Sequence, residues 1–531
     1  MPTRTPIRLL VPALSLALLT ATAACTSVQD PLPPQIGPKA AAAPSAEGAA
    51  PSALLPATGP LTLTVQDAVL AALANNQSLA VQKINPQLSR LAQDAARAAF
   101  DPHVTGQLSG GHSETGSIVT NSPAAQVAIQ EFLPTGTTIT LGVSANATEY
   151  SAPPATVDSH TNSASLSVTQ SLLRGAGTDV NLATLRQARL DTLSSEYELR
   201  GFAQTLLADT ENAYWDYVLA KRQLEIVLRS LDLAQQQRDE TLERIRLGKL
   251  AGNELAAADA EVALRQENLI NARSALARTR LSLIRLINPG GERMWDREVE
   301  TRSVPALEEV ALDPVETHIT LAGKMRPDLN QARLRIQRGE LDLIKTKNGL
   351  LPRLDLFMTL GGTGYSDSFG QQPGRTVNGE NYSAAAGLAF DWPVFNRAAE
   401  AAHKCARHNQ RQAREAMANL SQLAEQDVRN AYLEVQRTRE QIRATAATRK
   451  AQEEKLRDET EKFRLGKSTA LLVGQAQRDL LSSQIAEVQS ALAYMKSFVN
   501  LYRLDGSLLE TRGIAAPGAA PVVLDDPRIP R

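Results

Sequence analysis

The chain contains an internal duplication, which constrains its fold more than any other feature. Asn-Ala-Tyr occurs at 212–214 and again at 430–432, and Arg-Leu-Gly-Lys occurs at 246–249 and again at 464–467. Both pairs are separated by 218 residues. Two independent matches at one spacing indicate that the chain folds as two copies of one supersecondary unit.

Long segments in both copies show the periodicity of packed helices. Apolar and small residues recur at alternating steps of three and four from Ala203 to Ala234, and every seven residues from Leu255 to Leu283. Leu481 to Tyr502 follow the same rule, which is a heptad pattern. An aromatic content of only 4% also suits long helices more than large globular cores. One helix over 179–246 would be on the order of 100 Å long, which excludes a compact globule.

Segments with period two lie between the helices. In the second copy apolar residues alternate with polar or small ones over 354–360 and 388–392, and in the first copy over 139–145 and 166–172. A weaker alternation begins at Val104. Each segment has about the length of a tilted strand that crosses a bilayer with one apolar face. Beyond the N-terminal region no run of 18 apolar residues remains, so any membrane crossing is expected to use strands.

The first copy holds additional residues in its strand region. Pro102 and Pro352 are 250 residues apart, whereas Leu172 and Val394 are 222 apart, so the first copy is longer by 28 residues. Helices flank each strand region on one side of the membrane, so each copy must cross it an even number of times. Two alternatives follow: a fourth strand over 125–132 with a turn at 134–136, or an elaborated external loop.

The N-terminus carries an export signal. Arg4 and Arg8 precede an apolar stretch over 9–19, which leads to small residues ending at Cys25. This resembles a lipoprotein signal peptide at 1–24, with Cys25 as the lipidated first residue; an ordinary secretory signal is the alternative. Residues 25–60 are rich in Pro and Ala and predict a tether behind the lipid anchor.

The duplicated order of helix, strand pair and long helical hairpin, with the strand exit at 170–175, resembles the TolC-like outer-membrane efflux protein family. The resemblance extends over about 61–509. It implies a mostly α fold with a membrane β-barrel, in which duplicated long-helix hairpins form a trimeric α-barrel joined to that β-barrel. Each protomer of the homotrimer is then expected to contribute four strands to a twelve-stranded barrel.

The same resemblance divides the mature chain. A first repeat is expected at 61–288, with strands over about 103–173 and a hairpin tip near 248. An equatorial segment follows at 289–319. A second repeat is expected at 320–505, with strands over about 353–395 and a tip near 466, and a C-terminal tail at 506–531.

The function implied by the resemblance is that of an outer-membrane channel with a long periplasmic extension. Its expected partners are outer-membrane lipid, a periplasmic adaptor (membrane fusion) protein and an inner-membrane transporter of an efflux or type I secretion system. The hairpin tips would contact the adaptor, although glycine and basic residues at a helix end also have a capping role. The predicted tip residues are Arg246, Leu247, Gly248, Lys249, Arg464, Leu465, Gly466 and Lys467.

A candidate gate lies just beyond the tips. Similar proteins place acidic residues after the second tip, where this chain has Leu472 and Gln475, and the first tip supplies Glu254 at the position that matches Leu472. We therefore hypothesise a hydrophobic ring from Leu472 with charge from Glu254. The alternative is that Glu254 is simply an acidic residue in a first helical turn, where the helix dipole favours it.

Other functions find little support. A net charge of −1 argues against nucleic-acid binding, and no nucleotide-binding or nucleophile motif indicates an enzyme or a cofactor. His403, Cys405 and His408 are two and five apart, which does not converge on one helix face, so no metal site is expected. A lipid-anchored periplasmic coiled-coil scaffold without a pore explains the heptads and Cys25, but not the paired alternating segments in both copies.

Overall fold

The computed structural model describes residues 59–152, 155–289, 294–303, 311–366 and 381–523. The chain separates into two units, Met1–Ser52 and Ala53–Arg531, and every described residue belongs to the second. The predicted signal peptide, Cys25 and nearly all of the predicted tether therefore lie outside the described residues.

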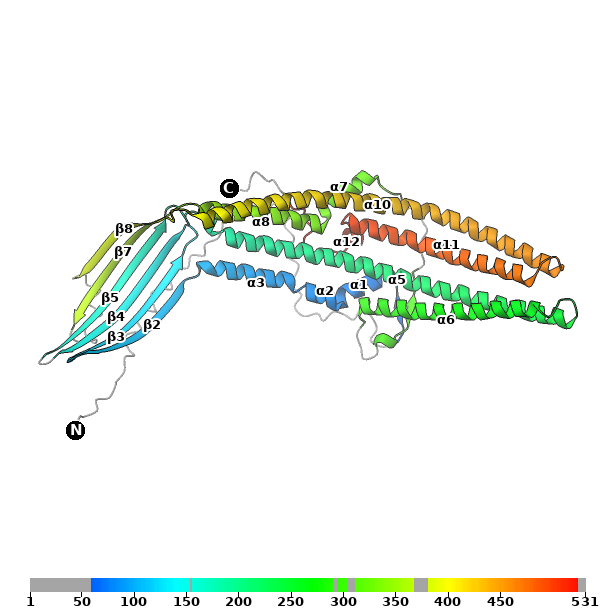
Figure 1. Cartoon of the computed structure of the whole chain (residues 1–531), viewed down its shortest axis with the longest axis horizontal. Coiled ribbons are helices and arrows are strands. Elements are labelled where there is room, and N and C mark those ends of the chain that lie inside the picture. The colour runs from blue at the N-terminus through cyan, green and yellow to red at the C-terminus, as the bar shows by residue number, and fades with distance from the viewer. Residues whose placement is uncertain (1–58, 153–154, 290–293, 304–310, 367–380, 524–531) are drawn as a thin grey trace, which may run out of the picture. The chain divides into compact units, whose positions relative to one another are not determined.

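Two long helical hairpins dominate the fold (Figure 1). In the first, α5 (Ala183–Arg246, 64 residues) is followed by α6 (Glu254–Ile287), and in the second, α10 (Arg397–Arg464) is followed by α11 (Ala470–Leu504). At 1.5 Å per residue α5 is about 96 Å long. Among the described residues, no helix combines the length and the apolar character needed to span a bilayer.

Shorter helices extend each hairpin toward the sheet. The first copy has α1 (Val65–Asn75), α2 (Gln77–Gln82) and α3 (Asn85–Arg97), and the second has α7 (Val315–Met325) and α8 (Pro327–Gly349). The helix α3 packs on α5, and α8 packs on both α5 and α10. Four helices thus lie side by side at this level: α3, α5, α8 and α10.

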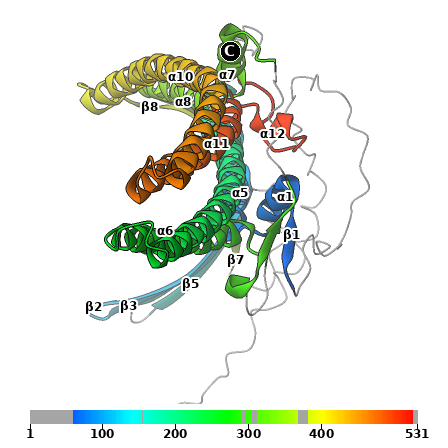
Figure 2. The ribbon, with the colours of Figure 1, turned by 90° about the vertical axis from the view of Figure 1, so that its right-hand side faces the viewer.

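Near the middle of the long helices the core is completed by short elements. The strand β1 (Leu61–Leu63) pairs in parallel with β6 (Val299–Thr301), which follows the single-turn helix η2 (Met294–Asp296). Tyr214 and Tyr217 of α5 donate hydrogen bonds to the carbonyls of Leu63 (3.1 Å) and Val299 (2.8 Å). In Figure 2 the hairpins form a curved layer, and β1, α1 and α12 (Leu508–Thr511) lie on its convex side.

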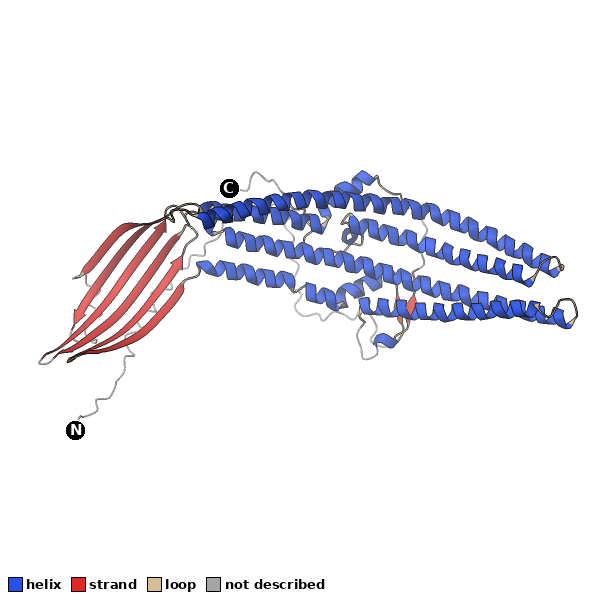
Figure 3. Ribbon diagram, in the orientation of Figure 1, coloured by secondary structure: helices blue, strands red, loops and turns tan. Residues whose placement is uncertain are grey.

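Six strands form one antiparallel sheet at the end of the long helices that lies away from the two hairpin turns (Figure 3). Their order is β2-β3-β4-β5-β7-β8. A single turn of 3₁₀ helix, η1 (Ala98–Phe100), leads into the first of them. The strands are β2 (His103–Thr115), β3 (Ile118–Phe132), β4 (Thr137–Ala152), β5 (Ala155–Ser171), β7 (Arg353–Ser366) and β8 (Tyr382–Asp391).

The strand number differs from the four per chain that the resemblance implies. The first copy contributes four strands and the second two, so the additional residues form a hairpin within the sheet and not an external loop. This hairpin, β3 and β4, turns at Gly136, whose φ of +87° suits glycine. Because β3 pairs with β2 and β4, and β4 pairs with β3 and β5, both strands of the hairpin have hydrogen-bonded neighbours on both sides, which physically favours strands over a loop.

The pairing register places the apolar residues on one face. Val104, Ile129, Leu141, Leu166 and Leu360 stand opposite one another across five strands. Four of these side chains are exposed, from 40% for Leu166 to 69% for Val104, and Ile129 is partly buried. The outer edges of β2 and β8 have no strand partner in the described part of the chain.

Candidate functional site at the paired helix ends

Both hairpin ends close with the same backbone turn. Gly248 and Gly466 adopt φ of +69° and +72°, in the left-handed region. The N–H of Lys249 donates to the carbonyl of Arg244 (2.9 Å), and Lys467 makes the equivalent bond to Lys462 (2.8 Å). This is the Schellman arrangement that ends helices, so the repeated Arg-Leu-Gly-Lys sequence does have a capping role.

The two turns also present an apolar side chain each. Leu247 is 66% exposed and Leu465 is 71% exposed. The neighbouring Arg246 and Arg464 fold back onto acidic residues of their own helices, Glu243 at 2.6 Å and Glu461 at 2.9 Å. The leucines therefore stand at the extreme ends of the hairpins with charged side chains around them.

The first contact between the hairpin ends involves an arginine and a buried aromatic ring. The guanidinium of Arg244 donates to the carbonyl of Phe463 at 3.1 Å and lies 4.9 Å above the centre of its ring. Phe463 is only 1% exposed and packs with Ala470 and Val473. This joins the end of α5 to the end of α10.

Glu254 makes the second contact. It is the first residue of α6, and its carboxylate accepts a hydrogen bond from the backbone N–H of Ala470, the first residue of α11, at 3.2 Å. Its negative charge therefore meets the positive end of the neighbouring helix as well as that of its own. The first two turns of α11 also carry Leu472, 45% exposed, and Gln475, which is exposed as well.

A third contact, which the sequence did not indicate, is a charge network between α6 and α11. Glu261 forms an ion pair with Arg478 of α11 and another with Arg265 of its own helix, at 3.2 Å. The side chains of Glu261 and Arg265 are only 15% and 1% exposed. Burial lowers the pKa of Arg265, an effect that Glu261 opposes and Arg478 reinforces.

Gly474 allows this close approach. A Cβ atom at this position would lie 3.1 Å from Cγ of Glu261, so a larger residue would push the carboxylate away from α11. A glycine inside a long helix weakens that helix, so its presence there is consistent with a close packing contact, although it does not identify the charged partners.

Between the hairpins, residues of α5, α10 and α11 line an open groove of about 350 Å³. Apolar and polar side chains line it in about equal measure, and among the polar ones Arg449 and Glu487 form an ion pair at 2.7 Å. The apolar lining includes Ile226, Leu233, Leu456, Leu480 and Val488.

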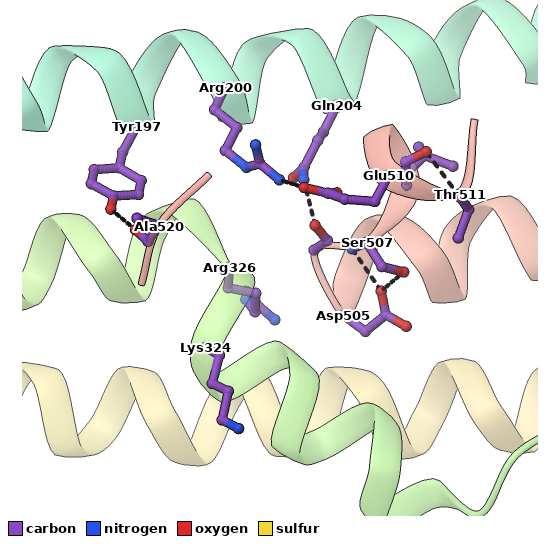
Figure 4. Close-up of polar contacts among 12 residues, drawn as sticks. Tyr197, Arg200, Gln204, Lys324, Arg326, Asp505, Ser507, Glu510, Thr511 and Ala520 are labelled. Atoms are coloured by element: carbon purple, nitrogen blue, oxygen red, sulfur yellow. Dashed lines mark hydrogen bonds and ion pairs between the residues drawn. The ribbon is translucent and has the colours of Figure 1, made fainter. Parts of the chain in front are cut away.

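A second polar cluster, away from the tips, holds α12 against α5 (Figure 4). Arg200, whose side chain is 1% exposed, forms an ion pair with Glu510, and Gln204 donates to the carbonyl of Gly506 at 2.8 Å. Arg512 binds the buried carboxylate of Glu211 through two hydrogen bonds, at 2.6 and 2.8 Å. Such two-pronged pairs fix orientation as well as charge.

Asp505 is fully buried beside this cluster. It accepts hydrogen bonds from the backbone and side chain of Ser507 (2.9 and 2.6 Å), and Nδ1 of His318 lies 2.8 Å away. Burial raises the pKa of the Asp505 carboxyl, an effect that Ser507 and His318 oppose.

The C-terminal segment continues from this cluster along α5 and α8. The Tyr197 hydroxyl donates to the carbonyl of Ala520 (Figure 4), and the N–H of Val522 donates to Asn330 at 3.0 Å. The part of the predicted tail that the structure describes is therefore bound to the helices.

The three residues considered for a metal site lie on α10. His403 contacts the hydroxyl of Thr346 through Nδ1 at 3.1 Å, and Cys405 is exposed. Within the described ranges, no group of three or more His, Cys, Asp and Glu side chains has the geometry to hold a metal ion.

One family model matches the chain by sequence. The sequence model of the family described as outer membrane efflux protein matches residues 69–289 and 319–507. No curated protein sequence matches the chain.

Solved structures share the fold at low sequence identity. The CmeC outer membrane channel of Campylobacter jejuni has a TM-score of 0.64 at 16% identity, over 84% of this chain and 86% of that one. VceC, an outer membrane protein of Vibrio cholerae, has a TM-score of 0.62 at 17% identity, over 83% and 96%. CusC has a TM-score of 0.64 at 18% identity, over 83% and 92%.

Proposed function

This chain belongs to the outer membrane efflux protein family, and from this premise we propose that it is the outer-membrane channel of a tripartite export system. The TolC-like resemblance seen in the sequence is confirmed. In this proposal the channel is passive: it receives substrates from an inner-membrane transporter through a periplasmic adaptor and needs no cofactor or catalytic step. That system is one of efflux or of type I secretion, and the choice between the two depends on the partner transporter, because the transporter selects the cargo.

We propose that three copies close the sheet into a transmembrane β-barrel. Two observations support this: one face of the sheet exposes a continuous set of apolar side chains, and the edges of β2 and β8 are unpaired in the described chain. Backbone groups at an open edge cannot remain unsatisfied in lipid, so β2 of one copy would pair with β8 of the next. Six strands from each of three copies give eighteen strands.

The long hairpins would form the periplasmic α-barrel of the same trimer. Exposed Leu247 and Leu465, with Gly248, Gly466 and the flanking basic residues, are proposed to contact the adaptor at the tips. The groove between α5, α10 and α11, which apolar and polar side chains line in about equal measure, is proposed to receive side chains of an adaptor hairpin. The fit of a helix with an apolar face into such a groove is a common recognition mode.

Gating would take place at the same tips. We propose that Leu472 and Gln475, exposed on α11, together with Glu254 narrow the resting channel. The contacts Arg244–Phe463, Glu254–Ala470 and Glu261–Arg478 would hold the hairpins together in that state. Unchanged ion selectivity and resting conductance in a Glu254→Gln channel, measured in planar bilayers, would remove Glu254 from the constriction.

At its N-terminus the mature protein is proposed to carry a lipid on Cys25, which would tether it to the outer membrane. Radiolabelled palmitate is expected to be incorporated into the wild-type protein and lost in Cys25→Ser. Equal labelling of the two proteins would contradict lipidation at this position.

The observation that carries the channel proposal is the sheet, because its exposed apolar face has no use in an aqueous scaffold. Single-particle imaging of the protein purified from membranes in detergent tests it. Hollow, three-fold particles with eighteen strands are expected. Solid rods, or a Cys25→Ser protein that is soluble without detergent, would contradict the channel proposal and favour the lipid-anchored coiled-coil scaffold.

A further inference from the structure

The face of the sheet opposite the apolar one is polar and carries almost no charge. Gln107, Gln126, Ser144, Ser163 and Thr363 stand opposite one another across five strands on this face. Apart from His103, Arg353, Asp355 and Asp391 near the helices, the described residues of this face are Ser, Thr, Gln, Asn, Gly, Ala and a few larger uncharged side chains.

The strands do contain charged residues, but the pairing register places most of them on the opposite face of the sheet. Glu114, Glu131, Glu149 and Asp158 all lie on the other face, together with the apolar residues. Asn121, opposite Glu149 in the register, donates a hydrogen bond to that carboxylate at 3.1 Å. A slip of one residue would move every one of these carboxylates to the polar face.

Hydroxyl groups of neighbouring strands satisfy one another on the polar face. The Oγ atoms of Ser144 and Ser163 are 2.7 Å apart, and Oγ of Ser167 is 3.3 Å from Oγ1 of Thr359. Each hydroxyl both donates and accepts hydrogen bonds, so this surface can meet either kind of polar group on a passing solute.

The charges near the helices do not influence the middle of this face. Arg353 and Asp355 form an ion pair at 2.6 Å, and Asp391 stands opposite Arg353 in the register. Ser171 stands opposite Asp355, and Ser163 lies eight residues farther along β5, a distance of about 26 Å at 3.3 Å per residue. This is about three Debye lengths at physiological ionic strength.

On the basis of the proposed function, in which this face lines the pore, we propose that the outer-membrane segment of the channel does not discriminate by charge. It admits cationic, anionic and neutral polar solutes alike through a hydroxyl-rich passage. Selection by charge then falls to the helical tips, where Glu254, Glu261 and several arginines gather.

Cysteine labelling in intact membranes tests the local potential directly. Ser144→Cys and Ser163→Cys would be made in a Cys405→Ser background, because Cys405 is exposed. Their reaction rates with a cationic and an anionic methanethiosulfonate of similar size would be compared with those of a small free thiol. The Cys405→Ser parent gives the background, and Val143→Cys, on the apolar face beside Ser144, is the matched control.

We expect both cysteines to react, with a cation-to-anion rate ratio within about twofold of the free thiol. Adding Gln126→Glu, opposite Ser144, is expected to raise that ratio severalfold and shows that the assay detects a single charge. A tenfold preference for either reagent without that substitution would overturn charge indifference and leave the channel intact. An unreactive Ser144→Cys with a reactive Val143→Cys would instead refute the channel lining itself.

Discussion

Replacing Arg478 by alanine is expected to loosen the resting tips. Arg478 pairs with Glu261 across the two hairpins, and a hydrogen bond between charged groups contributes about 1.5–3 kcal/mol. We expect the lower value, because the Arg478 side chain is 38% exposed and Glu261 keeps Arg265 as a second partner. A loss of about 1.5 kcal/mol shifts the closed-to-open equilibrium of each copy about tenfold toward the open state.

Glu261→Gln is expected to have the larger effect. It leaves Arg265, 1% exposed, without its anionic partner, and removal of one member of a buried pair costs about 3–5 kcal/mol. Single-channel recording in planar bilayers measures both variants through the fraction of time spent above the resting conductance. The predicted order is wild type, then Arg478→Ala, then Glu261→Gln.

Arg238→Ala is the matched control. Arg238 pairs with Asp259 at 2.8 Å, but both residues belong to the first hairpin and are exposed, where ion pairs contribute little. An Arg478→Ala channel that opens no more often than the Arg238→Ala channel would refute the idea that the contact between α6 and α11 holds the tips together.

Three further predictions concern the rest of the chain. Burial raises the folded pKa of Asp505 above its unfolded value, so the stability that Asp505 contributes is complete in acid and is lost as pH rises through the folded pKa. Over that pH range, hydrogen exchange of residues 506–513, corrected for intrinsic rates, should become faster in the wild type than in Asp505→Asn. Parallel exchange profiles of the two proteins would contradict this. Arg512→Ala leaves the buried Glu211 without its cationic partner at a cost of about 3 kcal/mol, so the hydrogen-exchange rate of α12 should rise by about two orders of magnitude. Arg512→Lys should give an intermediate rate, and an unchanged rate in Arg512→Ala would show that the pair is dispensable. Deletion of residues 118–154 joins β2 to β5 through Gly116 and Ser117 and keeps opposite each other the residues of β2 and β5 that now lie in line across β3 and β4. The shortened protein should give twelve-stranded particles in images. Failure to assemble would show that the β3–β4 hairpin is essential.

The helical part of the fold could be predicted because its signals are local. The heptad pattern and the Arg-Leu-Gly-Lys turns depend on residues within one or two turns of one another, and both hairpins end at Gly248 and Gly466 as that sequence requires. The strands β2 and β3 are harder to predict. In β2 only Val104 and Leu108 mark the apolar face, and in β3 Pro123 interrupts the alternation of apolar and polar residues. The sequence pattern therefore did not distinguish a strand from a loop, and the distinction comes from the pairing of the strands in the sheet.

The contacts between the hairpins could not be predicted from sequence. Glu261 and Arg478 are 217 residues apart, and their ion pair exists only because α6 packs on α11. Arg265 looks like any solvated arginine of a long helix, yet its side chain is buried. The bound C-terminal segment is similar, since a stretch rich in Pro and Ala gives no sign that Tyr197 and Asn330 hold it.

In the proposed trimer, the six strands of each copy would take up about the same circumference as its helices. With strands about 4.8 Å apart and tilted by about 40°, each strand takes up about 6 Å of circumference, so six take up about 38 Å. The four helices α3, α5, α8 and α10, at 8–10 Å between axes, take up about 32–40 Å. Four strands would span only about 25 Å and would force the helices to converge toward the membrane. With the added hairpin, each copy of the proposed trimer would fill nearly the same arc in the β-barrel and in the α-barrel, so the proposed channel could keep one bore across their junction.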